Sequence, residues 1–220
     1  MAIRVLLVDD HKMVIEGLKG LLAIDGAIEV VGEAQTGERG LQLAGQLAPD
    51  VMVLDVTMPG LNGIETMKRI RVLAPETEVI GLSMHATGQV ICDMLRAGAS
   101  GYILNTSPPE VVVRAIRDTA SGESVLAPQV AGKILQRIRE LQISIASSGQ
   151  STASEIRAVL TERELQVFAQ LATGHTNHQI GAELGLSPNT VSNHIKSILT
   201  KLHLHNRIQA AAYAVRAGMS

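Results

Sequence analysis

Short, almost wholly apolar runs alternate with helical patterns through the first 121 of the 220 residues. Unbroken apolar runs of this length are typical of parallel strands that are covered on both faces of a sheet. They predict five strands, at residues 3–8, 28–32, 51–54, 78–83 and 101–104. The intervening patterns predict five helices, at residues 12–24, 36–48, 62–73, 87–97 and 108–121. Five strand–helix units in this length indicate a doubly wound α/β domain rather than a barrel.

The remainder of the chain has a different pattern. A helical stretch at residues 129–141 is followed by a small, polar segment at 144–152, which has the composition of a flexible linker. From residue 156 on, every pattern is helical. We therefore predict three parts: an α/β domain at 1–121, a helix and linker at 122–155, and a small all-α domain at 156–220.

Composition and charge narrow the class of protein. One cysteine, Cys92, excludes a disulfide framework, and three aromatic side chains are too few for a platform that stacks single-stranded nucleic acid. No apolar run approaches the length of a membrane span and no charged leader precedes an apolar one, so we expect a cytoplasmic protein without membrane contact. Residues 1–125 carry a net charge of −6 and residues 156–220 carry +3. The basic part is thus a candidate for binding a polyanion.

Three aspartates stand at the ends of two predicted strands. Asp9 and Asp10 follow the first strand, and Asp55 follows the third. In a flavodoxin-like sheet of order 2-1-3-4-5 these strands are neighbours, so the three carboxylates would meet in one crevice. A hard cation such as Mg²⁺ would relieve their repulsion, and an aspartate beside it can accept a phosphoryl group. Ser83, which ends the fourth strand, would face the same crevice and bond a phosphoryl oxygen.

Taken singly, each of these aspartates could be a helix cap or a loop acid, but the combination favours a shared site. The motifs around it are Val8-Asp9-Asp10-His11, Asp55-Val56-Thr57-Met58-Pro59-Gly60, Asn62-Gly63, Leu82-Ser83-Met84-His85 and Gly101-Tyr102-Ile103-Leu104. Together they resemble the receiver domain of two-component response regulators, over about residues 1–121. The resemblance implies that a histidine kinase phosphorylates Asp55. It also implies that Asp9, Asp10, Asp55 and the backbone carbonyl of Thr57 hold Mg²⁺, and that Ser83 and Tyr102 form a switch pair.

One position departs from the family pattern. Asn105 stands where the family places a lysine, directly after the Gly-Tyr-x-Leu stretch. An amide can donate a hydrogen bond to a phosphoryl oxygen but brings no charge, and charge-assisted bonds contribute about 1.5–3 kcal/mol against about 1 kcal/mol for neutral ones. The hypothesis is that Asp55 still binds Mg²⁺, while phosphorylation is slow or weakly coupled to the switch. The alternative is a regulator that works without phosphate, through dimerisation, a small ligand or a protein partner.

The all-α part contains the pattern of a helix-turn-helix. Thr161 and Glu164 form a capping-box pattern, and Asn177 is a candidate cap for the next helix. A glycine-containing turn then leads into a helix at about 189–202, which in such motifs lies in the major groove of DNA. The polar face of that helix carries Ser192, Asn193 and Lys196, of which Asn193 can read adenine and Lys196 can reach guanine or phosphate. The same pattern also fits an ordinary amphipathic helix.

Further motifs favour the DNA-binding interpretation. They are Leu160-Thr161-x-Arg163-Glu164, Thr190-Val191-Ser192-Asn193-His194-Ile195, Lys201-Leu202 and Asn206-Arg207. These resemble the LuxR-type helix-turn-helix of NarL/FixJ regulators, with the helix-turn-helix itself at Gln179 to Ile198. The resemblance implies base contacts from Ser192, Asn193 and Lys196 to double-stranded DNA, and a homodimer paired through the last helix. His194 and Lys201 are expected on the DNA backbone, and Ser192 and His178 replace commonly basic residues.

An enzyme is the rival from a different class. The haloacid-dehalogenase phosphatases also combine a carboxylate nucleophile with Mg²⁺, but they require a second aspartate two residues later, where this chain has Thr57. We therefore expect no enzymatic activity and no catalytic residue. The five histidines after residue 155 match no zinc-binding spacing.

Overall fold

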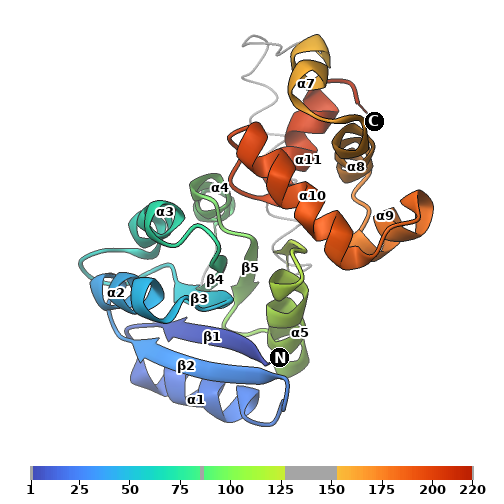
Figure 1. Cartoon of the computed structure of the whole chain (residues 1–220). Helices are drawn as coiled ribbons and strands as arrows, with labels where there is room; N and C mark the ends of the chain where they lie inside the picture. Colours follow the sequence, from blue (N-terminus) through green and yellow to red (C-terminus); the bar gives the residue numbers. More distant parts are fainter. Residues whose placement is uncertain (1, 85–86, 127–152, 220) are drawn as a thin grey trace. The chain divides into compact units, whose positions relative to one another are not determined.

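Parallel strands and helices alternate in the N-terminal part of the computed structural model, which describes residues 2–84, 87–126 and 153–219 (Figure 1). The elements are β1 (Ile3–Val8), α1 (Lys12–Leu22), β2 (Ile28–Ala34), α2 (Gly37–Leu47), β3 (Val51–Asp55), α3 (Gly63–Leu73), β4 (Glu78–Ser83), α4 (Gly88–Ala97), β5 (Gly101–Leu104), α5 (Pro109–Ala120) and β6 (Val125–Leu126). They form one parallel sheet of order β2-β1-β3-β4-β5-β6. The predicted flavodoxin-like fold is confirmed, and β6 extends it by a strand that the sequence analysis did not predict.

The apolar strands are buried because helices cover both faces of the sheet. All five residues of β3 are buried. On one face, side chains of β1, β3 and β5 pack against α1 and α5, with Ile15, Leu22 and Ile116 among the buried residues. On the other face, α2 packs against β1 and α3, and α3 packs against α4.

The register of the strands brings the predicted polar residues to one edge of the sheet. Val8 is paired with Leu54 and Ser83 with Leu104, so the residues that follow these strands share that edge. The loop after β3 returns closely onto the strand. A Cβ at Gly63 would lie 2.4 Å from the carbonyl oxygen of Asp55, which explains why glycine is needed at the start of α3. The side chain of Asn62 caps this helix by accepting a hydrogen bond from the backbone of Glu65.

Among the residues that the structure describes, five helices form the C-terminal part. They are α7 (Ala153–Val159), α8 (Glu162–Ala172), α9 (Asn177–Leu184), α10 (Pro188–Lys201) and α11 (Arg207–Arg216). Their core contains Phe168, Ile180, Val191 and Ile198, all fully buried. A Cβ at Gly181 would lie 2.5 Å from the carbonyl oxygen of Leu186, so the tight turn between α9 and α10 requires glycine at this position. These two helices and their turn are the predicted helix-turn-helix.

The helix caps agree with the sequence pattern in one case and differ in another. Thr161 and Glu164 form the predicted capping box at the start of α8. The cap of α9 is Thr176, which forms a second capping box with Gln179, and not Asn177. Asn177 is the first helical residue and is buried, because its side chain accepts a hydrogen bond from Arg207 on α11. The prediction for Asn177 was therefore wrong by one position.

The described residues divide into two compact units. The first holds residues 2–84, 87–120 and 125–126, and the second holds residues 121–124 and 153–219. The predicted helix at 129–141 and the linker at 144–152 lie outside the described residues, so the domain limits at 121 and 156 stay predictions. In the described part of the chain, every helix is too short or too polar to cross a lipid bilayer.

Candidate functional site

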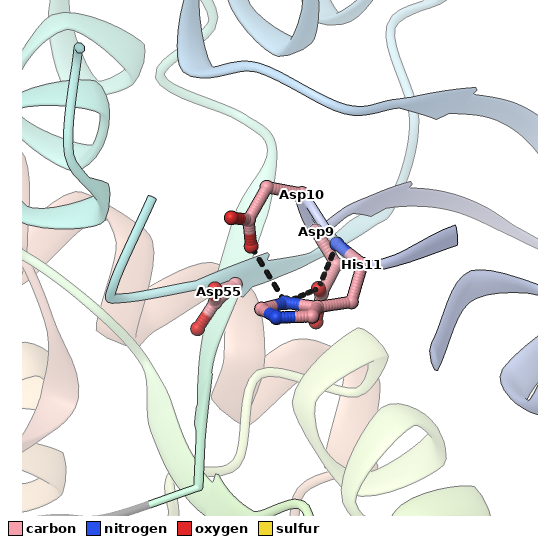
Figure 2. A group of neighbouring side chains, drawn as sticks. All are labelled: Asp9, Asp10, His11 and Asp55. Carbon is pink, nitrogen blue, oxygen red and sulfur yellow. Dashed lines mark hydrogen bonds and ion pairs between the residues drawn. The ribbon is translucent and has the colours of Figure 1, made fainter. Parts of the chain in front are cut away.

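The three predicted aspartates lie together at the carboxyl edge of the sheet, and a histidine joins them (Figure 2). Asp9, Asp10, His11 and Asp55 each offer one ligand atom, and these four atoms all lie within 4.8 Å of one another. The ring Nδ1 of His11 lies 2.8 Å from Oδ1 of Asp10 and 3.3 Å from Oδ1 of Asp9. The crevice that the strand order predicts is therefore present.

Burial, with smaller contributions from neighbouring charges, raises the pKa of the two buried aspartates of this cluster. Asp9 is 2% exposed and Asp55 is 6% exposed. Burial raises the pKa of Asp55 to about 6, with smaller contributions from the negative charges of Asp9 and Asp10. Burial also raises the pKa of Asp9. The negative charge of Asp10, followed by that of Asp9, raises the pKa of the exposed His11 ring. Removing negative charge from this crevice, or adding positive charge to it, is thus favourable.

The donor set fits a hard divalent cation. Oδ2 of Asp9 is buried and has no hydrogen-bond partner among the described residues. Its other oxygen, Oδ1, accepts a hydrogen bond from the backbone N–H of His11 at 2.8 Å. Oδ1 of Asp55 accepts one from the backbone N–H of Thr57 at 3.1 Å. Each carboxylate is thereby oriented by the backbone and keeps an oxygen for another ligand.

The residues of the predicted switch lie at the same edge. Ser83 ends β4 and is buried, and Tyr102 on β5 is fully buried, with its ring against the backbone of Gly81. Burial raises the pKa of the Tyr102 hydroxyl, and the charge of Asp55 adds to this effect. A hydrogen bond with Ser83 opposes this effect and lowers the pKa, and the assignment of Ser83 and Tyr102 as a switch pair stays a prediction.

Asn105 lies beside Ser83. Its backbone N–H donates to the carbonyl oxygen of Ser83 at 3.0 Å. Its side-chain oxygen is buried without a hydrogen-bond partner in the part of the chain that the structure describes. The residue lines a cavity of about 380 Å³ between α1 and α5, together with Leu104 and Val112. The side chain at position 105 is therefore an uncharged amide that borders open space.

His11 is the member of the cluster that sequence reasoning missed. Its place directly after two site aspartates in the motif Val8-Asp9-Asp10-His11 is a signal that could have identified it. His11 does occupy the N-cap position of α1, but its side chain makes no capping hydrogen bond. The ring is directed at the carboxylates instead.

The second candidate site is the polar face of α10. Val191, Ile195 and Ile198 are buried on the opposite face, as the helical spacing predicted. Asn193 and Lys196 are exposed, and Ser192 and His194 are half-buried. His178 is exposed on α9. The amphipathic pattern of α10 is therefore present, with its polar side chains accessible in the second unit.

Lys201 is held by a buried carboxylate on α8. Its Nζ donates to Oε2 of Glu164 at 2.7 Å, and the hydroxyl of Ser197 donates to Oε1 of Glu164 at 2.6 Å. Burial would raise the pKa of Glu164, but hydrogen bonds from Lys201, Ser197 and Thr161 outweigh it and lower the pKa to about 2. Glu164 thus joins the last turn of α10 to α8. A DNA phosphate would have to compete with this carboxylate for Lys201.

Comparison with known proteins gives two family matches. The model of the response regulator receiver domain matches residues 5–117. The model of the luxR family of bacterial regulatory proteins matches residues 158–214. The two matches fall on the two predicted folded domains.

Relatives are similar to this chain along nearly its whole length. The transcriptional regulatory protein LiaR of Bacillus subtilis is 41% identical over 214 residues, which cover 97% of each chain. A nitrate/nitrite response regulator homolog of Haemophilus influenzae is 34% identical over 208 residues, which cover 94% of each chain. Among solved structures, response regulator ChrA of a heme-sensing two-component system is 31% identical, with a TM-score of 0.52 over 100% of this chain and 99% of that one. A LuxR-family response regulator from Aurantimonas is 32% identical, with a TM-score of 0.61 over 63% of this chain and 99% of that one.

Proposed function

The chain belongs to the two-component response regulators that combine a receiver domain with a LuxR-type DNA-binding domain, and on this premise we propose that phosphorylation of Asp55 by a sensor histidine kinase controls its binding to double-stranded DNA. It is a DNA-binding transcriptional regulator and not an enzyme. The observation that carries the assignment of Asp55 is the carboxylate cluster, in which three aspartates share one crevice and burial raises the pKa of Asp55 to about 6.

The cluster accounts for both metal binding and phosphoryl acceptance. Asp9, Asp10, Asp55 and the backbone carbonyl of Thr57 would hold Mg²⁺, as the unpartnered Oδ2 of Asp9 supports. Mg²⁺, when bound, supplies positive charge that offsets the carboxylates and the phosphoryl oxygens. An oxygen of deprotonated Asp55 would attack the phosphorus of the kinase's phosphohistidine, and the P–N bond would break with its electron pair going to the leaving imidazole. The other oxygen of Asp55 would stay oriented by the N–H of Thr57. The hydroxyl of Ser83 would move toward the phosphoryl group and donate to one of its oxygens. The ring of the buried Tyr102 would move in response.

The second unit supplies the output. Ser192, Asn193 and Lys196 on α10 read base edges in the major groove, and His178, His194 and Lys201 contact the DNA backbone. The accessibility of Asn193 and Lys196 supports this assignment. A homodimer would present two such helices to half-sites about one helical turn apart.

Acetyl phosphate with Mg²⁺ provides a test that requires no kinase. Intact-mass spectrometry measures the phosphoryl-aspartate, and light scattering measures dimer formation in the same samples. We expect labelling and dimer formation in the wild-type protein, and neither in Asp55→Ala. Asp93→Asn removes a carboxylate on α4, outside the cluster, and is the control that keeps labelling. Labelling of the Asp55→Ala protein would contradict the assignment.

Asn105 favours a second candidate function. Because no lysine stands at this position, the phosphorylated state gains one fewer charge-assisted bond than in a receiver that has one. The second candidate is a regulator that dimerises and binds DNA without phosphate. A wild-type protein that takes up no label, yet binds DNA as tightly as the acetyl-phosphate-treated protein, would establish it and remove phosphorylation control.

A further inference from the structure

The exposed side chains of α10 lie on one stripe of the helix. Before its last residue, the helix has exposed side chains at Asn189, Asn193, Lys196 and Thr200. These positions are spaced by four, three and four residues, and residues three or four apart are neighbours on the surface of a helix. The buried side chains of α10 lie between them in the sequence, at Val191, Ile195 and Ile198. A partner of α10 therefore meets a stripe that includes Asn189, which the sequence analysis did not select.

The two asparagines of this stripe have amides that are available to a partner. In the first turn of α10, the hydroxyl groups of Ser187 and Thr190 lie 2.8 Å apart and bond to each other. At the other end of the stripe, the hydroxyl of Thr200 donates to a backbone carbonyl one turn earlier at 3.0 Å. Among the described residues, the amides of Asn189 and Asn193 have no hydrogen-bond partner. Both amides can therefore pair with a ligand without breaking a contact within the protein.

The chemistry and spacing of these amides suit two adenines. An asparagine amide can bond to both N6 and N7 of adenine in the major groove. Asn189 is the second residue of α10, and the N-terminal residues of a recognition helix are those that contact base edges. Asn193 lies one turn further on, about 6 Å along the helix axis. Because base pairs rise by about 3.4 Å each, the two amides reach base pairs no more than about two steps apart.

We propose that Asn189 is a second base-reading residue, so that each half-site contains two adenines within two base-pair steps of each other. Asn189 reads one of them and Asn193 reads the other. The proposal rests on the DNA binding of the proposed function and adds the sequence that the polar face of α10 recognises.

The test is the selection of duplexes from a random library by the full chain, with and without acetyl phosphate and Mg²⁺. Sequencing of the bound duplexes gives the base preference of wild type, Asn189→Ala, Asn189→Arg, Asn193→Ala and Thr200→Ala. Fluorescence anisotropy at one salt concentration then compares the affinity of each protein for the wild-type site and for a shuffled duplex. Thr200→Ala is the matched control, because Thr200 lies on the same stripe but its hydroxyl is bonded to the backbone. Circular dichroism checks that the variants stay folded, which the exposure of Asn189 leads us to expect.

We expect Asn189→Ala to lose the preference at one A·T pair and to bind the wild-type site about tenfold more weakly, with the shuffled duplex unaffected. Asn193→Ala should lose the preference at the other A·T pair, and Thr200→Ala should match wild type. Asn189→Arg should change the preferred base at the first position from adenine to guanine, because a guanidinium pairs with N7 and O6 of guanine. This change of preference cannot result from unfolding.

Two results would overturn the proposal and leave DNA binding standing. One is an unchanged base preference in both Asn189→Ala and Asn189→Arg. The other is an equal loss of affinity for the wild-type site and the shuffled duplex in Asn189→Ala, since the residue would then contact the DNA backbone. If wild type selected no sequence under either condition, the proposed DNA binding would itself be wrong, and this proposal would be wrong with it.

Discussion

At the scale of the residue, the acidic cluster makes the stability of the first unit depend on pH. Burial raises the pKa of Asp55 from 3.8 to about 6, so the folded state binds this proton more tightly than the unfolded state does. The contribution of Asp55 to stability is therefore complete below about pH 3.8 and is lost as the pH rises through about 6. In chelator-treated protein, we expect Asp55→Asn to be more stable than wild type at neutral pH, by on the order of 2 kcal/mol.

Urea denaturation followed by circular dichroism measures this difference. The gap between Asp55→Asn and wild type should shrink as the pH falls from 7 toward 4, since wild-type Asp55 then becomes protonated. Asp118→Asn changes a carboxylate on α5, outside the cluster, and should show no such gap. A gap that stayed constant over this range would mean that Asp55 is not the titrating group.

The pKa of Glu164 is shifted in the opposite direction to that of Asp55. Its pKa is lowered from 4.5 to about 2, chiefly by hydrogen bonds that outweigh burial, so its contribution is present above about pH 4.5 and is lost as the pH falls through about 2. We expect Glu164→Gln to destabilise the second unit at neutral pH by about 1–3 kcal/mol, because Lys201 and Ser197 lose a charged acceptor. Thermal unfolding measures the loss. Glu162→Gln, an exposed neighbour on α8, should be near neutral, and equal effects of the two changes would contradict the role of Glu164.

The residues of the acidic cluster show how much of this site can be predicted from the sequence. Asp9 and Asp55 were predictable, because the end of a buried strand fixes where the next side chain stands. The turn of the His11 ring toward them was not predictable, since a side chain at an N-cap can point to the helix or away from it. The cap of α9 is different. Thr176 with Gln179 three residues later is a capping-box pattern that the sequence already contains, and the hydrogen bond from Arg207 to Asn177 is a tertiary contact that the sequence does not indicate.

At the level of single elements, the polar face of α10 that we propose contacts DNA carries two chemically different side chains, whose roles mutations can separate. Asn193 offers an amide that can pair with an adenine edge, whereas Lys196 offers a charge. The measurement uses a duplex site that the wild-type protein has selected from a random library. On this duplex, Asn193→Ala should reduce the free energy of DNA binding by about 1–3 kcal/mol and relax the sequence preference at one base pair. Lys196→Ala should weaken binding to all sequences and reduce the slope of log affinity against log salt by about 1.

Fluorescence anisotropy over a range of salt concentrations measures both effects. Arg157→Ala removes an equal charge from α7 and should leave the slope and the base preference unchanged. A loss of slope with Arg157→Ala as large as with Lys196→Ala would mean that total charge, and not α10, determines binding.

The elements themselves differ in how well the sequence predicts them. The five long strands were predicted because their apolar runs are continuous, as burial on both faces requires. The strand β6 was not, since a two-residue strand has no periodicity and is defined only by its pairing with Gly101 and Tyr102 of β5. The five helices of the first domain and the helix predicted at 189–202 agree with the structure to within one or two residues at each end, whereas α7 begins at Ala153, inside the part predicted as a helix and linker.

At the scale of the whole molecule, the question is how strongly a phosphoryl group on Asp55 is coupled to DNA binding in the second unit. Residues 1–125 carry a net charge of −6 and residues 156–220 carry +3. Phosphorylation can change DNA affinity only if it shifts the receiver between states that differ in how tightly the second unit binds DNA. The hypothesis is that Asn105, which lies beside Ser83, weakens this coupling because its amide brings no charge to the phosphoryl group.

Restoring the cation should therefore strengthen the coupling. A charge-assisted bond exceeds a neutral one by about 1 kcal/mol, which corresponds to roughly a fivefold change in an equilibrium. The cavity of about 380 Å³ beside Asn105 leaves room for a longer side chain. We expect Asn105→Lys in the full chain to label faster with acetyl phosphate, and to raise the ratio of phosphorylated to unphosphorylated DNA affinity about fivefold. Thr106→Lys places the same charge one residue further along, at an exposed position, and should change neither quantity. Should Asn105→Lys label no faster than wild type, the missing lysine would not be what restrains this receiver, and control by another ligand or partner would gain support.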